Sequence, residues 1–235
     1  MRALPLILAL VSVLVIAITG CGGGSGPTEL PASQYFPLAQ GNQWYYRVTD
    51  YTVDGSGAVR AMSSRRPLLP GSRLLGLARV KTAQEGPGES TLIVSITGTK
   101  RIDGITWFEA STLQPPLETE TVYFRHDADG LLVRGSAEDE PSYRIRRPIE
   151  AGNAWNPLSD EDWQIEILAV DETVDVEAGA FADCLQTEES GTWEGEAYRG
   201  LTWFAPKVGP VYTEDYFDGE LAVKSELTSY SVTAN

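Results

Sequence analysis

The amino-acid sequence predicts an all-β, antiparallel domain, and two observations carry this prediction. Four Asp-Gly pairs stand beside alternating or β-rich residues: Asp54-Gly55, Asp103-Gly104, Asp129-Gly130 and Asp218-Gly219. Asp-Gly suits two-residue hairpin turns because both central positions of such turns need positive φ. After the N-terminal apolar run, no segment shows apolar residues at helical spacing.

Strands are expected where β-branched and aromatic residues alternate with polar ones. In chain order these segments are Trp44–Val53, Arg73–Thr82, Thr91–Thr99, Thr106–Thr112, Thr121–Arg125, Tyr143–Arg146, Gln164–Val170, Thr173–Glu177, Val211–Phe217 and Glu220–Val232. The last two, joined by Asp218-Gly219, form the clearest hairpin, in which Leu221, Val223, Ser225 and Leu227 share one face.

A short motif occurs twice in the chain. Pro37-Leu38-Ala39-Gln40-Gly41-Asn42-Gln43-Trp44 is followed later by Pro148-Ile149-Glu150-Ala151-Gly152-Asn153-Ala154-Trp155. The single β domain at 35–235 is therefore interpreted as two repeats, 35–140 and 145–235. Because a Trp directly after a turn is an ordinary core anchor, Trp44 and Trp155 are expected in the core rather than on a ligand platform.

The N-terminus has the layout of a secretory signal peptide. Arg2 precedes an apolar run from Leu4 to Ile18, and small residues then lead to Cys21. The run is 15 residues long, whereas a membrane-spanning helix needs about 17–25. Cleavage is therefore favoured over a transmembrane anchor.

The segment Ile18-Thr19-Gly20-Cys21 resembles the lipobox of bacterial lipoproteins. The resemblance implies that residues 1–20 are removed and that Cys21 carries the lipid. Residues 21–34 would then be the lipidated cysteine and a flexible linker, which is rich in Gly, Ser and Pro. Gly22 stands where Asp would signal inner-membrane retention, so the resemblance favours the outer membrane, facing the periplasm.

The charge balance excludes some partners. The chain has 33 acidic and 18 basic residues, and removal of Arg2 with the signal peptide leaves 17 basic ones. Nucleic acid and anionic membrane surfaces reward clustered Lys and Arg, so neither is expected as a partner. The acidic groups Glu138-Asp139-Glu140, Asp160-Glu161-Asp162 and Glu194/Glu196 are expected to be solvated loop charge.

Cys184 has no intramolecular partner once Cys21 is lipidated, because the chain contains two cysteines. A buried or half-buried structural thiol is expected, with Phe181 and Leu185 out of phase with Cys184. Its neighbours Asp183, Glu188 and Glu189 would not stabilise a reactive thiolate.

No catalytic motif is found, and no catalytic residue, metal site or cofactor is expected. His126 is the single histidine and is expected to be a solvated turn residue. Asp127, Asp129 and Glu138 sit at EF-hand loop positions, but Leu131 and Leu132 stand where that loop needs a ligand and a glycine, so the motif is rejected.

Arg144, Arg146 and Arg147 form a compact basic cluster. On a strand, Arg144 and Arg146 would share one face, opposite Tyr143 and Ile145. Pairing with acidic residues is favoured over clamping an anion.

Three segments resemble a group of uncharacterised exported bacterial lipoproteins: Tyr35-Phe36-Pro37-Leu38 with Gly41-Asn42 and Trp44-Tyr45, the run from Val176 to Cys184, and the run from Trp203 to Val211. The resemblance implies a curved antiparallel sheet or partly open β-barrel, akin to half-barrel lipoprotein carriers of acyl chains.

These observations favour a membrane-anchored envelope lipoprotein that is a non-catalytic structural or partner-binding module. The alternative is a half-barrel carrier of a lipid-like or other apolar ligand. Six tryptophans and ten tyrosines can fill a small barrel, which favours the first. The expected partners are the membrane, through Cys21, and an envelope protein or an apolar ligand.

Overall fold

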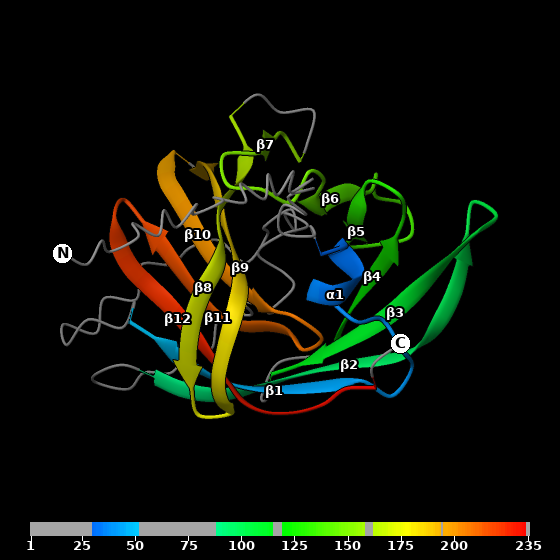
Figure 1. The fold of residues 1–235 in the computed structure, drawn as a ribbon, viewed down its shortest axis with the longest axis horizontal. Helices are drawn as coiled ribbons and strands as arrows, with labels where there is room; N and C mark the ends of the chain where they lie inside the picture. Colours follow the sequence, from blue (N-terminus) through cyan, green and yellow to red (C-terminus); the bar gives the residue numbers. More distant parts are fainter. Residues whose placement is uncertain (1–29, 52–87, 115–118, 158–161, 194, 234–235) are drawn as a thin grey trace, which may run out of the picture.

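The computed structural model describes residues 30–51, 88–114, 119–157, 162–193 and 195–233. These residues form one antiparallel sheet that closes into a nearly complete barrel with one unsealed seam (Figure 1). The predicted all-β, partly open barrel is confirmed. The signal peptide, Cys21, the strand at 73–82 and the Asp54-Gly55 turn lie outside the described residues.

The described residues form one short helix and twelve strands (Figure 1). They are α1 (Ala32–Tyr35), β1 (Gln43–Asp50), β2 (Gly88–Ile102), β3 (Ile105–Leu113), β4 (Glu120–His126), β5 (Gly130–Arg134), β6 (Ser142–Arg146), β7 (Ala154–Trp155), β8 (Gln164–Val176), β9 (Gly179–Trp193), β10 (Glu196–Ala205), β11 (Gly209–Phe217) and β12 (Glu220–Ser231).

The sheet consists of two meanders joined through the first and last strands. Its order is β6-β5-β4-β3-β2-β1-β12-β11-β10-β9-β8-β7, so β6 and β7 are the two edges. At this seam the Trp155 indole N–H donates to the Tyr143 carbonyl, at 2.9 Å, and the Asn153 amide donates to the Arg146 carbonyl, at 2.9 Å. Side-chain bonds therefore bridge a junction that backbone ladders close elsewhere.

Two Asp-Gly pairs form the predicted hairpin turns. Asp103 and Gly104 have φ of 52° and 77°, and Asp218 and Gly219 have φ of 49° and 81°. The third pair is Asp129-Gly130, and there Gly130 instead begins β5. The turn is closed by a hydrogen bond from the Asp127 N–H to the Gly130 carbonyl, at 3.0 Å.

The α1 end of the barrel holds a dense aromatic core. Phe36 stacks on Trp44 at 5.3 Å between ring centroids and meets Phe124 edge-on at 5.0 Å. Tyr46 and Phe204 complete this core and are at most 1% exposed. The flexible linker expected through residue 34 ends earlier, because α1 begins at Ala32, which is already buried.

The two motif copies form the same turn. Their glycines have φ of 92° and 87°. In each copy the Asn amide donates to the Pro carbonyl, Asn42 to Pro37 at 3.0 Å and Asn153 to Pro148 at 2.7 Å. Trp44 and Trp155 are both buried, as expected for core anchors. The two-repeat interpretation itself stays a prediction.

The β8–β9 hairpin extends past β10 and reaches β12. Pairing of β9 with β10 ends at Leu185, and the remaining tip places the Ala178 N–H 3.0 Å from the Leu227 carbonyl. Phe181 and Tyr230 meet with ring centroids 6.1 Å apart. The tip thus lies against the part of β12 that does not pair with β11.

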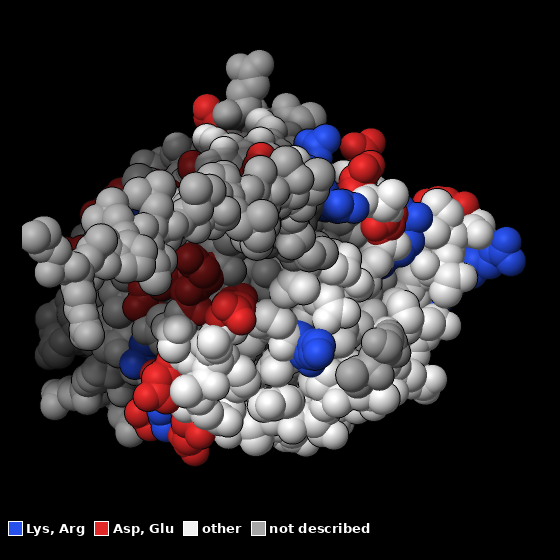
Figure 2. Space-filling view, viewed as in Figure 1, with Lys and Arg blue, Asp and Glu red and all other residues white. Residues whose placement is uncertain are grey.

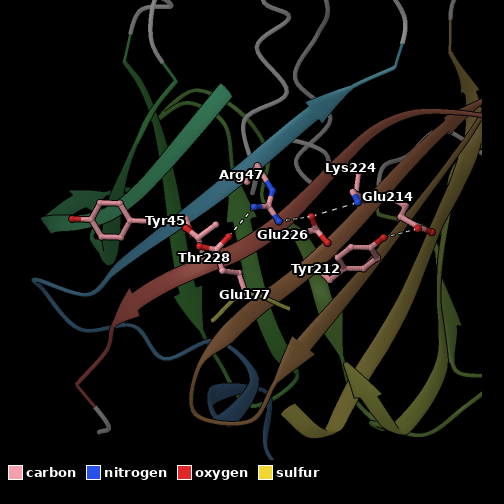
Figure 3. Close-up of polar contacts among 8 residues, drawn as sticks. All are labelled: Tyr45, Arg47, Glu177, Tyr212, Glu214, Lys224, Glu226 and Thr228. Carbon is pink, nitrogen blue, oxygen red and sulfur yellow. Dashed lines mark hydrogen bonds and ion pairs between the residues drawn. The ribbon is translucent and has the colours of Figure 1, made fainter. Parts of the chain in front are cut away.

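A row of charges on β12 and β1 fixes this tip (Figure 3). Arg47 contacts Glu177 of the tip at 2.7 Å and Glu226 at 3.1 Å, and Lys224 lies 3.4 Å from Glu226. Burial of the phenol and its hydrogen bond to Glu214 raise the pKa of Tyr212 on the neighbouring strand. All these charges have partners within the chain, so this row serves the fold.

Candidate functional site

The inner face of β9–β12 carries polar residues in register. Thr187 pairs with Thr202, Thr202 with Thr213, and Thr213 with Ser225, which places four hydroxyl groups side by side across four strands. All four residues are buried. We call these residues, with Ser142, Arg144, Glu189, Tyr198 and Asp215, the polar layer.

Arg144 of β6 lies in the interior of the barrel and binds the opposite side of the seam. Its guanidinium contacts the Glu189 carboxylate at 2.7 Å and donates to the Thr202 hydroxyl at 2.9 Å. The Arg144 and Glu189 side chains are 4% and 2% exposed, so water screens this ion pair little. Removing one partner of such a pair is strongly destabilising, because the other charge stays buried and uncompensated.

A glycine makes room for a second buried contact. The Tyr198 hydroxyl donates to the Asp215 carboxylate at 2.5 Å. It lies directly over Gly200, where a Cβ atom would come within 2.4 Å of the hydroxyl oxygen. Burial raises the pKa of Tyr198 well above its ordinary value, and the nearby Asp215 and Glu189 carboxylates raise it further.

Aromatic rings cover the polar layer at the end away from α1. Trp163 meets Trp193 and Tyr198 with ring centroids 6.4 and 5.4 Å apart. Its indole also lies on Gly191 of β9, where a Cβ would come within 2.6 Å of the ring. Glycines on β9 and β10 therefore let aromatic side chains lie flat on the inner face.

Several polar atoms of this layer have no hydrogen-bond partner among the described residues. They are Ser142 Oγ, Arg144 Nε, Thr187 Oγ1 and Ser225 Oγ, and all four atoms are buried. Native proteins satisfy about nine in ten buried polar groups or more, and each of these four atoms departs from that rule.

Arg144 and Arg146 of the basic cluster lie on different faces of β6, unlike the sequence expectation. Arg144 is 3% exposed, whereas Arg146 is exposed and lies 5.4 Å from the centre of the Tyr143 ring. The prediction that both share one face is wrong, because a register shift in the β5–β6 pairing breaks the alternation. The expectation that the cluster pairs with acidic residues is confirmed at Arg144.

His126 is not a solvated turn residue, which corrects the sequence expectation. It ends β4, is half-buried, and its Nε2 lies 2.8 Å from the Phe36 carbonyl. Burial lowers the pKa of His126, and the carbonyls of Phe36 and Gly130 partly offset this effect. The α1 segment folds over the end of β4, which the sequence did not indicate.

Cys184 is a free, fully buried thiol, as expected. Burial raises the pKa of Cys184 to about 11. Leu185 is also buried, and the expected opposite phase of these two residues stays a prediction. Asp183 adopts a positive φ of 55° and interrupts the alternation immediately before them.

The loop that begins at Asp127, whose spacing was compared above with the EF-hand, uses the Asp127 carboxylate for contacts within the protein. Asp127 accepts hydrogen bonds from the backbone of Asp129 and Gly130 and from the Tyr143 hydroxyl.

Among the described residues, no group of three or more His, Cys, Asp or Glu side chains is arranged to hold a metal ion. Nor does any helix there have the length and apolar character needed to cross a membrane.

Charge is divided unevenly between the two halves of the chain. Residues 1–147 contain 15 basic and 14 acidic side chains, whereas residues 148–235 contain 3 basic and 19 acidic ones. In Figure 2 most blue atoms lie on the side of β2–β6, while red atoms dominate the side of β8–β12, some of them in a recess. Glu189 and Asp215 of the polar layer both belong to the acidic half.

Two solved structures are similar to this chain at low sequence identity. The sequence matches no protein-family model and no curated protein. A solved structure of a protein assigned as exported, with a YmcC-like fold, from Bacteroides fragilis NCTC 9343 is 14% identical, with a TM-score of 0.48 over 83% of this chain and 98% of that one. A protein assigned as a lipoprotein, from Parabacteroides distasonis ATCC 8503, is 12% identical, with a TM-score of 0.41 over 84% and 98%.

Proposed function

We propose that this chain is a bacterial cell-envelope lipoprotein, anchored through Cys21, that acts as a non-catalytic structural or partner-binding module. Its membrane would be the outer one and its domain would face the periplasm. Support for export and lipidation comes from the signal peptide and the lipobox-like segment.

The observation that carries the proposed module function is the filled α1 end of the barrel. Phe36, Trp44, Tyr46, Phe124 and Phe204 occupy it and are at most 1% exposed. A carrier of a lipid-like ligand would need an apolar volume of roughly 300–1,000 Å³. Because the chain's own rings fill this region, a surface that binds a partner is favoured over an apolar pocket.

The lipid anchor is tested by labelling growing cells with palmitate. The full chain would be expressed in a bacterial host, beside a Cys21→Ala variant as the matched control. We expect label in the first chain and none in the second, with the labelled chain in the outer-membrane fraction. Label in both chains, or a soluble labelled chain, would contradict the anchor assignment.

The module and the carrier are separated by site-specific photo-crosslinking in cells. One crosslinker would replace Val94, which is 2% exposed on the inner face of β2. Others would replace the exposed apolar residues Ile105, Leu113 and Tyr230. A module gives protein adducts at the exposed positions, whereas lipid adducts at Val94 alone would favour the carrier.

A further inference from the structure

We propose that the polar layer is an internal binding site for small neutral molecules rich in oxygen, either water or a polyol. This inference does not depend on the proposed function. It rests on the buried atoms that lack a hydrogen-bond partner: Ser142 Oγ, Arg144 Nε, Thr187 Oγ1 and Ser225 Oγ.

The unpaired atoms belong to one structural feature. Ser142 and Arg144 are alternate inner residues of β6, and Arg144 contacts Thr202, the direct partner of Thr187 in the sheet. Ser225 closes the same row of hydroxyls on β12. A buried polar group left unpaired retains its full desolvation penalty, so these groups indicate bound molecules that satisfy them.

The charges of the layer define the class of ligand. Glu189 and Asp215 are buried carboxylates that disfavour an anion. The Arg144 guanidinium disfavours a cation, and its free Nε–H requires an oxygen acceptor. A neutral molecule with hydroxyl groups can accept from Arg144 and also exchange hydrogen bonds with the serine and threonine hydroxyls.

The layer lies beside the seam of the barrel. β6 carries Ser142 and Arg144 and is an edge strand of the sheet, bridged to the other edge by side chains of the β7 segment. Opening the seam therefore breaks side-chain hydrogen bonds but no backbone ladder.

The test compares near-isosteric substitutions in the full chain. Thr187→Val removes an unpaired hydroxyl, and Thr202→Val removes one that accepts from Arg144, so the second variant is the matched control. We expect both variants to lower the Tm, and Ser225→Ala to do the same, because a bound molecule loses a partner. A Tm that rises in Thr187→Val and in Ser225→Ala while it falls in Thr202→Val would overturn the proposal, since removing a truly unpaired buried hydroxyl stabilises.

Glycerol distinguishes the two candidate ligands, water and a polyol. Its general exclusion from protein surfaces raises the Tm of every variant alike. A glycerol-dependent rise that is larger in the wild-type chain than in Thr187→Val identifies a polyol site. An equal rise in both chains, together with the expected Tm losses, identifies water.

Discussion

Replacing Arg144 by methionine should reveal the energetic weight of the polar layer. The variant leaves Glu189 and Asp215 buried without the guanidinium that lies between β6 and β9–β10. Breaking a buried ion pair on one side costs about 3–5 kcal/mol. For a domain of this size, 1 kcal/mol corresponds to about 2–4 °C, so Tm should fall by about 6–20 °C.

Urea unfolding followed by tryptophan fluorescence measures this loss. The matched control is Arg146→Met, the same change two residues later on the exposed face, which should cost less than about 0.5 kcal/mol. The double variant Arg144→Met/Glu189→Leu should regain most of the lost stability, because an apolar pair can replace a buried ion pair without net cost. A loss below about 1 kcal/mol in Arg144→Met, or a double variant as unstable as the sum of the singles, would refute this account.

Three further predictions concern single residues. The Cys184 thiol, whose pKa is raised to about 11, should resist alkylation at pH 8 in the folded chain and react only on unfolding. The pKa of His126 is lower in the folded than in the unfolded chain, so its stabilisation is fully present above the unfolded pKa of about 6.5. This stabilisation is lost as pH falls from that value through the folded pKa. The difference in Tm between wild type and His126→Gln should therefore shrink between pH 8 and pH 5. Trp155→Phe removes the hydrogen bond to the Tyr143 carbonyl and should cost about 1 kcal/mol, with faster amide exchange in β6 as the readout.

The strands that the sequence revealed are those whose inner and outer faces differ in polarity. In β12, Val223, Ser225 and Leu227 alternate with Lys224 and Glu226, and the hairpin to β11 follows from Asp218-Gly219. Strands β5, β7, β9 and β10 were missed. All five residues of β5 are buried, so it shows no alternation, and β9 carries Thr187 and Glu189 on its inner face, where apolar residues were sought.

The polar layer was not predicted from the sequence, also because its polar residues lie on the inner face. A buried Glu189 looks like a surface residue in the sequence, because Glu is rarely buried unless it is paired. Its partner Arg144 is 45 residues away and on the other side of the seam. The one usable signal was the excess of glycine and aromatic residues around Gly191, Tyr198 and Gly200, which marks places where rings lie on a sheet.

One proline links the seam to the polar layer. The Trp of the first motif copy lies in β1, which has eight residues, whereas the Trp of the second copy lies in β7, which has two. Pro157 stands where the first copy has Tyr46, and proline cannot donate to a strand ladder. The edge of β6 is therefore left without a ladder partner, and because β7 is so short, Arg144 can reach Glu189 and Thr202 beyond it. Pro157, two residues after the second motif copy, thus leaves the barrel open beside the strand that carries Arg144.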